Sequence, residues 1–242
     1  MIRLELPAAD HPIGDGGLLV AEGFTPTLQG EGPSAGQVAG FLRLSRCNLD
    51  CANCDTPYTW DWTRFDAREQ SRRIGVDVLL DWLTRHAPGL VVITGGEPLI
   101  QQDNLTPLVR GLVEAGRRVE IETNGTLVPD PELAGLVSFN VSPKLSRFGV
   151  SAARKRIVPR ALRALTRHGG RFKFVISELD ELAEVDALVA EHGLREVWLM
   201  PEGTTVAAID RGLVRLGEVA AERGYHLSDR LHVRLWGDER GR

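Results

Sequence analysis

Short apolar, β-branched runs alternate with amphipathic stretches from about residue 38 onward. The runs predict strands, at residues 38–45, 90–94, 118–123, 137–141, 172–176, 196–200 and 232–235. The stretches between them place apolar residues at helical spacing and predict helices, at residues 76–85, 104–115, 161–168, 182–192 and 206–223. Because parallel strands need long, usually helical, crossover connections, this repeated unit predicts an α/β fold with a parallel sheet.

Several of the strand runs are apolar without interruption, as in Leu90-Val-Val-Ile93. Such strands are typical of a sheet covered on both faces, and we expect a barrel or partial barrel. In these folds the functional groups lie at the carboxyl ends of the strands, where loops vary without disturbing the core. Residues 57–75 contain Trp60 and Trp62 but no clear period, so we expect an insertion outside the core.

The composition limits the size and the partners of the molecule. Of the 242 residues 43% are apolar, which predicts one globular domain over residues 1–242 with a core at about 22–236. The net charge of −4 provides no broad cationic field for nucleic acid or membrane, so a small-molecule partner is expected. No apolar run approaches the roughly 20 residues of a membrane helix, and the first ten residues lack a signal-peptide core. We therefore expect a cytoplasmic location.

All three cysteines lie on one predicted loop, directly after the first predicted strand. Cys47, Cys51 and Cys54 have a C-x3-C-x2-C spacing, and an odd number so close together does not suit a disulfide scaffold. Three thiolates can hold a cubane iron–sulfur cluster whose usual complement is four, which leaves one iron open to an outside ligand. A structural zinc site would need a fourth ligand from elsewhere in the fold, and buried free thiols are the third alternative.

Polar motifs follow three later strands. Thr94-Gly95-Gly96-Glu97-Pro98 has two glycines that let a ligand approach the backbone, although a tight turn alone would explain them. Strand alternation turns Glu120 and Glu122 to one face, either beside a polar ligand or toward solvent. Ser142-Pro143-Lys144 offers a hydroxyl and an ammonium group, or is an ordinary Ser-Pro turn beside a surface lysine.

The string from Arg43 to Thr56 resembles the signature of the radical S-adenosylmethionine superfamily. The resemblance implies a partial (βα)6-type barrel in which Cys47, Cys51 and Cys54 bind a [4Fe–4S] cluster. It also implies that S-adenosylmethionine chelates the fourth iron and that Gly96 contacts this cofactor. The radical is then generated on the cofactor, so no side chain is assigned as catalytic.

The order of several motifs is more specific. Leu28-Gln29-Gly30-Glu31-Gly32, Arg43, the cysteine loop, Thr56 and the motifs at Thr94 and Ser142 together resemble the 7-carboxy-7-deazaguanine synthase family, from about residue 22 to the C-terminal Leu-His-Val-Arg-Leu-Trp-Gly. Members of that family convert 6-carboxy-5,6,7,8-tetrahydropterin to 7-carboxy-7-deazaguanine with loss of ammonia, on the route to queuosine and other deazapurines.

This resemblance assigns roles to individual residues. It implies substrate contacts by Leu28, Gln29, Gly30, Arg43 and Thr94. Arg43 would pair with the substrate carboxylate, which suits the fork of a guanidinium group. It implies cofactor contacts by Gly96, Ser142, Pro143, Lys144, Met200, Pro201, Glu202 and Gly203. Thr56 would bind Mg2+, which takes few protein ligands.

The resemblance further implies a homodimer and an electron donor of the flavodoxin or ferredoxin type. Two other interpretations share the cysteine loop. A glycyl-radical-enzyme activase would act on a partner protein, and residues 28–32 together with Thr56 argue against it. A zinc-stabilised binding module would need a fourth protein ligand and no adenosylmethionine site.

Overall fold

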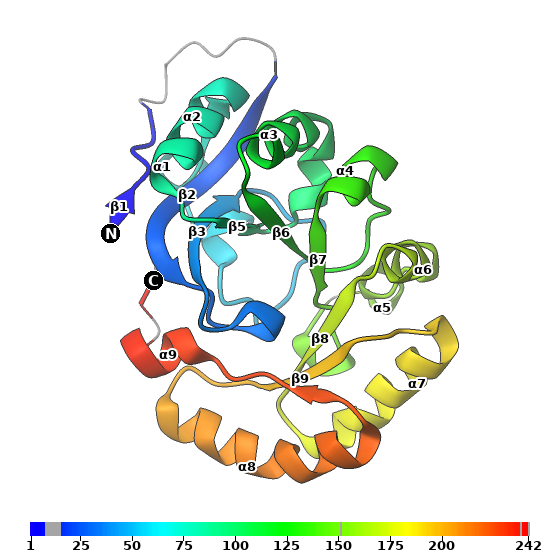
Figure 1. The fold of residues 1–242 in the computed structure, drawn as a ribbon. Coiled ribbons are helices and arrows are strands. Elements are labelled where there is room, and N and C mark those ends of the chain that lie inside the picture. Colours follow the sequence, from blue (N-terminus) through cyan, green and yellow to red (C-terminus); the bar gives the residue numbers. More distant parts are fainter. Residues whose placement is uncertain (8–15, 151, 238, 242) are drawn as a thin grey trace.

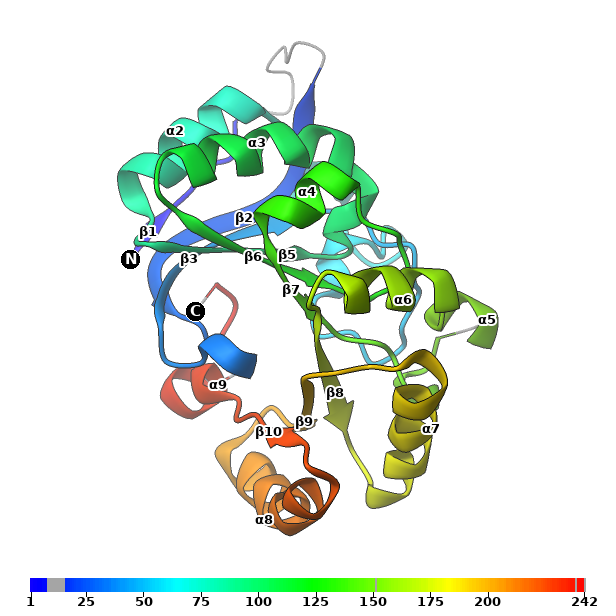
Figure 2. The same ribbon diagram turned by 45° about the vertical axis from the view of Figure 1, so that its right-hand side comes forward.

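A sheet of ten strands forms the centre of the computed structural model, which describes residues 1–7, 16–150, 152–237 and 239–241 (Figure 1). Six neighbouring strands of the described chain run parallel: β3 (Val38–Leu44), β5 (Leu90–Gly95), β6 (Arg118–Thr123), β7 (Ser138–Val141), β8 (Arg171–Ile176) and β9 (Val197–Pro201). Each was predicted to within one residue. The sheet curves but does not close on itself, which confirms the prediction of a partial barrel (Figure 2).

Helices connect successive parallel strands and cover the outer face of the sheet (Figure 1). They are α2 (Val76–His86), α3 (Gln102–Glu114), α4 (Pro131–Leu136), α5 (Ala153–Arg156), α6 (Pro159–Arg167), α7 (Leu182–His192) and α8 (Val206–Arg223). The five predicted helices are confirmed to within two residues. α6 shows why they form, because Leu162 and Leu165 are buried in the core while the arginines at positions 160, 163 and 167 face solvent.

The two faces of the parallel strands have different chemistry. On β3, Leu42 and Leu44 point outward into the main hydrophobic core between sheet and helices, and Phe172 and Phe174 do the same on β8. The alternate residues point into the barrel, because successive side chains of a strand face opposite ways. A small apolar cluster closes the bottom of the barrel, with the members Phe24, Ala39, Phe41, Leu90 and Val92. Above it the inner face is polar.

The N-terminal side of the sheet is antiparallel. β2 (Gly17–Leu28) pairs with β3 on one side and with β1 (Ile2–Arg3) and β4 (Arg72–Gly75) on the other. The prediction that residues 57–75 lie wholly outside the core is wrong for their last part. β4 joins the sheet and its Ile74 is buried in the core, while α1 (Ala67–Gln70) precedes it on the surface.

At the C-terminal side the predicted strand 232–235 is a helix, α9 (Leu231–Trp236). The sequence Leu231-His-Val-Arg-Leu-Trp236 alternates apolar and polar residues, which imitates a strand. The edge of β9 is already paired with β10 (His226–Leu227), so the chain turns away and buries Val233 while Leu235 stays exposed. In both ribbon views α9 lies beside the 3-10 turn at Gly32–Ser34, across the open side of the barrel (Figures 1 and 2).

Replacing Phe174 with Ala is expected to lower the free energy of unfolding by about 3–5 kcal/mol, since its fully buried ring fills the layer between β8 and the helices. Val214→Ala on α8, at a side chain that is 82% exposed, should change it by less than about 0.5 kcal/mol. Urea denaturation followed by circular dichroism measures both values. Equal losses in the two variants would contradict the assigned core.

Candidate active site

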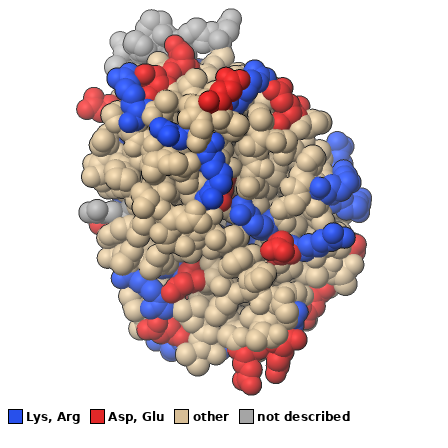
Figure 3. All heavy atoms as spheres, in the orientation of Figure 1, with Lys and Arg blue, Asp and Glu red and all other residues tan. Residues whose placement is uncertain are grey.

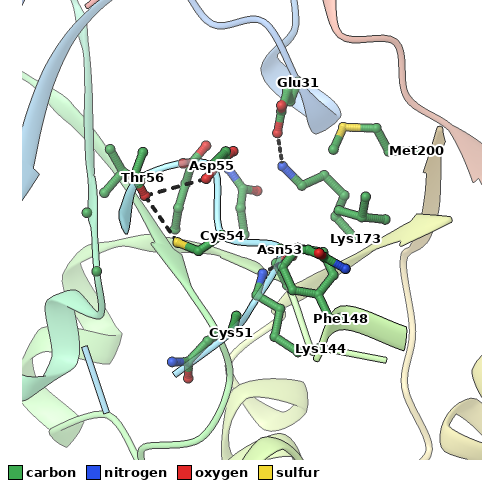
Figure 4. Close-up of a pocket in the computed structure, with 18 of the residues that line it drawn as sticks. Glu31, Cys51, Asn53, Cys54, Asp55, Thr56, Lys144, Phe148, Lys173 and Met200 are labelled. Carbon is green, nitrogen blue, oxygen red and sulfur yellow. Dashed lines mark hydrogen bonds and ion pairs between the residues drawn. The ribbon is translucent and has the colours of Figure 1, made fainter. Parts of the chain in front are cut away.

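A cavity of about 780 Å³ lies at the carboxyl ends of the parallel strands (Figure 4). Most of the residues singled out in the sequence line it: Leu28, Gln29, Gly30, Arg43, Cys47, Cys51, Cys54, Thr56, Thr94, Gly96, Ser142, Lys144, Met200 and Glu202. Pro143, Pro201 and Gly203 are not part of this lining. Pro201 ends β9 and lies close to Gly212 of α8, and the Gly203 carbonyl accepts a hydrogen bond from Arg230 (2.7 Å).

The cysteine loop is held against the two glycines at the end of β5. The Gly96 N–H donates to the Leu44 carbonyl (3.1 Å), and the Glu97 N–H donates to that of Arg46 (2.8 Å). A Cβ atom on Gly96 would lie 2.0 Å from the Arg46 carbonyl oxygen, and one on Gly95 would lie 2.1 Å from that of Leu44. The glycines therefore do more than admit a ligand, because they let the start of the cysteine loop pack on β5.

Glu97 joins the same region to the end of β6. Its buried carboxylate accepts hydrogen bonds from the Thr123 hydroxyl (2.8 Å) and the Asn124 N–H (2.7 Å). Burial raises the pKa of Glu97 even though these donors act in the opposite direction. The Asn124 side chain continues the network to Asn48 in the cysteine loop (3.0 Å). Glu97 is thus a buried support for the loop and not part of the cavity wall.

The side chains of the three cysteines line the cavity. The Trp60 indole donates to Cys54 (3.4 Å), and burial raises the pKa of Cys47 to about 12 and that of Cys51 to about 11. Within the described ranges, no three histidine, cysteine or acidic side chains already form a metal-binding group. Three soft donors on one loop suit an iron–sulfur cluster with one open iron, whereas a closed zinc site takes four ligands. Binding iron would release the thiol protons.

Arg43 lies on the inner face of β3, four residues before Cys47. Its Nε donates to Glu22 (2.7 Å), which also accepts from Tyr58 (2.8 Å) and Arg240 (3.0 Å). Burial raises the pKa of Glu22, but the two arginines and the Tyr58 hydroxyl outweigh it and hold that pKa below its usual value. The Glu22 carboxylate therefore holds the Arg43 side chain in place through its Nε atom. No described residue accepts a hydrogen bond from the two terminal nitrogens of this guanidinium group.

A second charged group spans the open side of the barrel and was missed in the sequence. Glu31 forms ion pairs with Lys173 of β8 (Figure 4) and with Arg230 (3.2 Å), and the His232 ring lies 3.7 Å from its carboxylate. Burial acts against the charge of Glu31, but these three partners outweigh it and hold its pKa far below the usual range. Burial lowers the pKa of His232, which favours the neutral imidazole. The sequence contained one sign of this charged cluster. Lys173 interrupts an otherwise apolar predicted strand, between Phe172 and Phe174.

Gly30 precedes this ion cluster and packs directly on α9. A Cβ atom at Gly30 would lie 2.2 Å from the His232 ring, and its carbonyl accepts from the Leu231 N–H (2.8 Å). The mispredicted C-terminal segment therefore lines the site because it is a helix.

The two glutamates of β6 point inward together, as strand alternation predicted. Glu122 lines the cavity and accepts from the Gln29 side chain (3.1 Å). Glu120 lies deeper and accepts from Ser34 (2.6 Å) and Asn140 (3.0 Å). Glu122 is therefore a wall of the cavity and Glu120 a support beneath it.

Lys144 and Ser142 lie beside the cysteine loop. The Lys144 ammonium group donates to the Ser142 hydroxyl (3.0 Å) and lies 4.9 Å from the centre of the Phe148 ring (Figure 4). The cavity lining thus combines the three thiols with the cations Lys144, Arg43 and Lys173 and the acid Glu122.

Comparison with known proteins identifies the family of the chain. Residues 42–193 match the radical SAM superfamily. The 7-carboxy-7-deazaguanine synthase of Pyrobaculum aerophilum is 38% identical over 89% of this chain and 94% of its own length. That of Rhodopirellula baltica is 34% identical over 96% of this chain and 91% of its own length. The chain belongs to the 7-carboxy-7-deazaguanine synthase family.

Solved structures give the same answer for the fold. The crystal structure of QueE from Escherichia coli superimposes with a TM-score of 0.68 at 28% identity, over 89% of this chain and 95% of that one. Streptococcus suis SuiB bound to S-adenosylmethionine shares the fold, with a TM-score of 0.53 at 13% identity, over 76% of this chain and 48% of that one.

As a member of the 7-carboxy-7-deazaguanine synthase family, the chain is a radical S-adenosylmethionine enzyme that acts on a small molecule. The superfamily brings a [4Fe–4S] cluster and S-adenosylmethionine as cofactors. The activase and the zinc-stabilised binding module are not favoured. None of the helices in the described ranges is long and apolar enough to cross a membrane.

Replacing Glu31 with Gln is expected to lower the free energy of unfolding by about 3–5 kcal/mol at pH 7, because Lys173 and Arg230 lose a buried counter-charge. The folded-state pKa of Glu31 is lowered, so its stabilisation is present above the unfolded pKa of about 4.3 and declines as the pH falls below it. The difference between wild type and variant should therefore narrow from pH 5 to pH 3. Urea titrations across this range measure it.

The exposed Glu218→Gln on α8 is the matched control and should have little effect at either pH. A loss for Glu31→Gln that stays constant down to pH 3 would exclude an electrostatic origin.

Proposed function

We propose that this chain converts 6-carboxy-5,6,7,8-tetrahydropterin to 7-carboxy-7-deazaguanine with loss of ammonia, in the biosynthesis of queuosine and other deazapurines. One observation carries the proposal. A half-buried arginine and three thiols from the same strand and its loop face one cavity, in a chain whose relatives bear this enzyme's name. An arginine fork fits a substrate carboxylate, and the thiols fit the cluster.

The proposed roles divide the cavity wall. Arg43 binds the substrate carboxylate through its terminal nitrogens, with Leu28, Gln29, Gly30 and Thr94 around the pterin. Cys47, Cys51 and Cys54 hold the [4Fe–4S] cluster. Gly96, Ser142, Lys144, Met200 and Glu202 contact S-adenosylmethionine. Support for this division comes from their common cavity, whose lining includes every one of these residues.

Pro143, Pro201 and Gly203 are not part of that lining, and we propose that they act by shaping the loops that carry Lys144 and Glu202. When bound, the cluster and S-adenosylmethionine supply the one-electron chemistry that opens a C–H bond of the substrate. The residues of this chain orient the pterin and exclude water, because a misplaced substrate would let the radical attack elsewhere.

We also propose that Thr56 binds the Mg2+ that orients the substrate carboxylate. Its hydroxyl lies on the cavity wall beside Asp55 (3.4 Å), and Mg2+ takes few protein ligands and completes its shell with water and substrate. The family resemblance further supports a homodimer in the cytoplasm, supplied with electrons by a flavodoxin- or ferredoxin-type protein.

Anaerobic reconstitution tests the proposal. The protein should take up about four irons per chain. With dithionite it should cleave S-adenosylmethionine and, given carboxytetrahydropterin and Mg2+, form the deazaguanine detected by mass spectrometry. Cys51→Ala should lose both iron and activity, whereas Asn53→Ala in the same loop should keep its iron. One bound zinc and no cleavage of S-adenosylmethionine would refute the proposed enzymatic function. Cleavage of S-adenosylmethionine without formation of the deazaguanine would indicate an activase.

Replacing Arg43 with Gln should raise the KM for carboxytetrahydropterin by about a hundredfold, since the loss of one partner of a buried charge pair costs about 2–5 kcal/mol. Arg240→Gln is the control, because Arg240 contacts the same Glu22 carboxylate without lining the cavity. Initial rates at varied substrate concentration measure both. An unchanged KM in Arg43→Gln would remove Arg43 from the substrate site.

A further inference from the structure

The charges are distributed very unevenly along the chain. Although its net charge is −4, the 45 residues between Glu132 and Glu178 contain ten lysines and arginines and neither aspartate nor glutamate. Some of these cations belong to the cavity, as Lys144 and Lys173 do. Others have no place in the active site.

Five of these cations form an exposed group on α5 and α6, which we name the basic surface: Arg154, Lys155, Arg160, Arg163 and Arg167. α6 buries its apolar face and turns its three arginines to solvent at i, i+3 and i+7. Figure 3 shows basic side chains gathered at the right-hand edge of the molecule, where α5 and α6 lie in Figure 1.

The fold does not neutralise the basic surface. The nearby Arg147 and Arg156 pair with Asp180 and Glu184, yet in the part of the chain that the structure describes no ion pair reaches the five residues themselves. The neighbouring α8 carries charges of both signs, whereas α7 carries only acidic residues besides His192, and two of them, Glu184 and Asp186, pair with Arg156 and Arg223. Like charges on one helix face lower its stability, so folding alone does not explain this composition.

The basic surface begins where the cysteine loop reaches the outside of the protein. The Ala52 N–H donates to the Gly149 carbonyl (3.1 Å), and the Asn53 side chain donates to the Arg147 carbonyl (3.1 Å). Ala52 and Asn53 are exposed, and they lie between two of the cluster-binding cysteines. Gly149 in turn precedes α5 by four residues. The back of the cysteine loop and the basic surface are therefore one continuous part of the exterior.

We propose that the basic surface is the docking site for an acidic one-electron carrier protein, an inference that rests on the proposed function. In each transfer the carrier is oxidised by one electron, and the cluster held by Cys47, Cys51 and Cys54 is reduced by one. Opposite charges raise the rate of encounter and fix its orientation, so the carrier's redox group arrives beside the cysteine loop. This adjacency favours an electron carrier over a nucleic acid.

The test compares two charge-reversal variants of the reconstituted full-length protein. Arg160→Glu/Arg163→Glu alters the basic surface. Arg195→Glu/Arg211→Glu is the matched control, with one exposed arginine before the amino end of β9 and one on α8. An acidic flavodoxin is the probe, and its Kd is measured by isothermal titration at low and high salt. The rate of S-adenosylmethionine cleavage is measured separately with reduced flavodoxin and with dithionite.

For the basic-surface variant we expect a Kd for flavodoxin about tenfold weaker and a flavodoxin-driven rate about tenfold slower at low salt. Its dithionite-driven rate should stay within about twofold of wild type, and salt should weaken binding of the wild type most. The control should behave like wild type throughout. The binding measurement does not depend on turnover, so it tests the docking site even if dithionite drives no cleavage, a result that would refute only the proposed function.

Unchanged flavodoxin affinity in the basic-surface variant would overturn the proposal, and so would an equal loss in the control. The same result follows if the variant keeps its flavodoxin affinity but loses binding to a short RNA or DNA duplex, because the surface would then serve a nucleic acid.

Discussion

Alternation along six parallel strands is the constraint on which the rest of the structure depends. Residues such as Leu42, Phe172 and Phe174 face the helices and form the core, so the intervening positions must face the interior of the barrel. Those positions hold Arg43, Thr94, Glu122, Asn140 and Lys173, which line the cavity. The same pattern that stabilises the outer layer therefore also places the polar groups of the active site, and a slip of one residue in a strand would exchange the two.

The barrel is open on one side, and in this chain a largely buried group of charged residues spans that opening. Glu31, just after β2, binds Lys173 of β8 and Arg230 ahead of α9. Gly30 brings the same segment against the His232 ring. The ions lie on the cavity wall, so their desolvation is offset only while all partners stay in position. The integrity of the site and the closure of the barrel thus depend on one cluster.

The sequence was informative where contacts are local or repeat with a period. The parallel strands and main helices were predictable, since continuous apolar runs and amphipathic stretches differ plainly. β2 was not, because its antiparallel neighbours bury nearly every residue and no alternation shows. α9 was mistaken for a strand because its sequence alternates like one. Only the pairing of β10 with β9 shows that the free edge of β9 is already occupied. Glu31 lies 142 residues before Lys173 and 199 residues before Arg230 in the sequence. Contacts over such separations leave no periodic pattern in the sequence, so they could not be predicted. The thiols, by contrast, were evident from their spacing.

Cys47 follows Arg43 by only four residues, and Arg43 lies on a strand that is paired with β2 on one side and with β5 on the other. The spacing between an anchor at Arg43 and a group held by Cys47 is therefore set by covalent geometry and a rigid ladder, not by the opening and closing of loops. The strand therefore keeps the distance between the substrate anchor and the cluster constant. Surface segments such as residues 61–71 can change in length or sequence between related enzymes without altering the distance over which the reaction must take place.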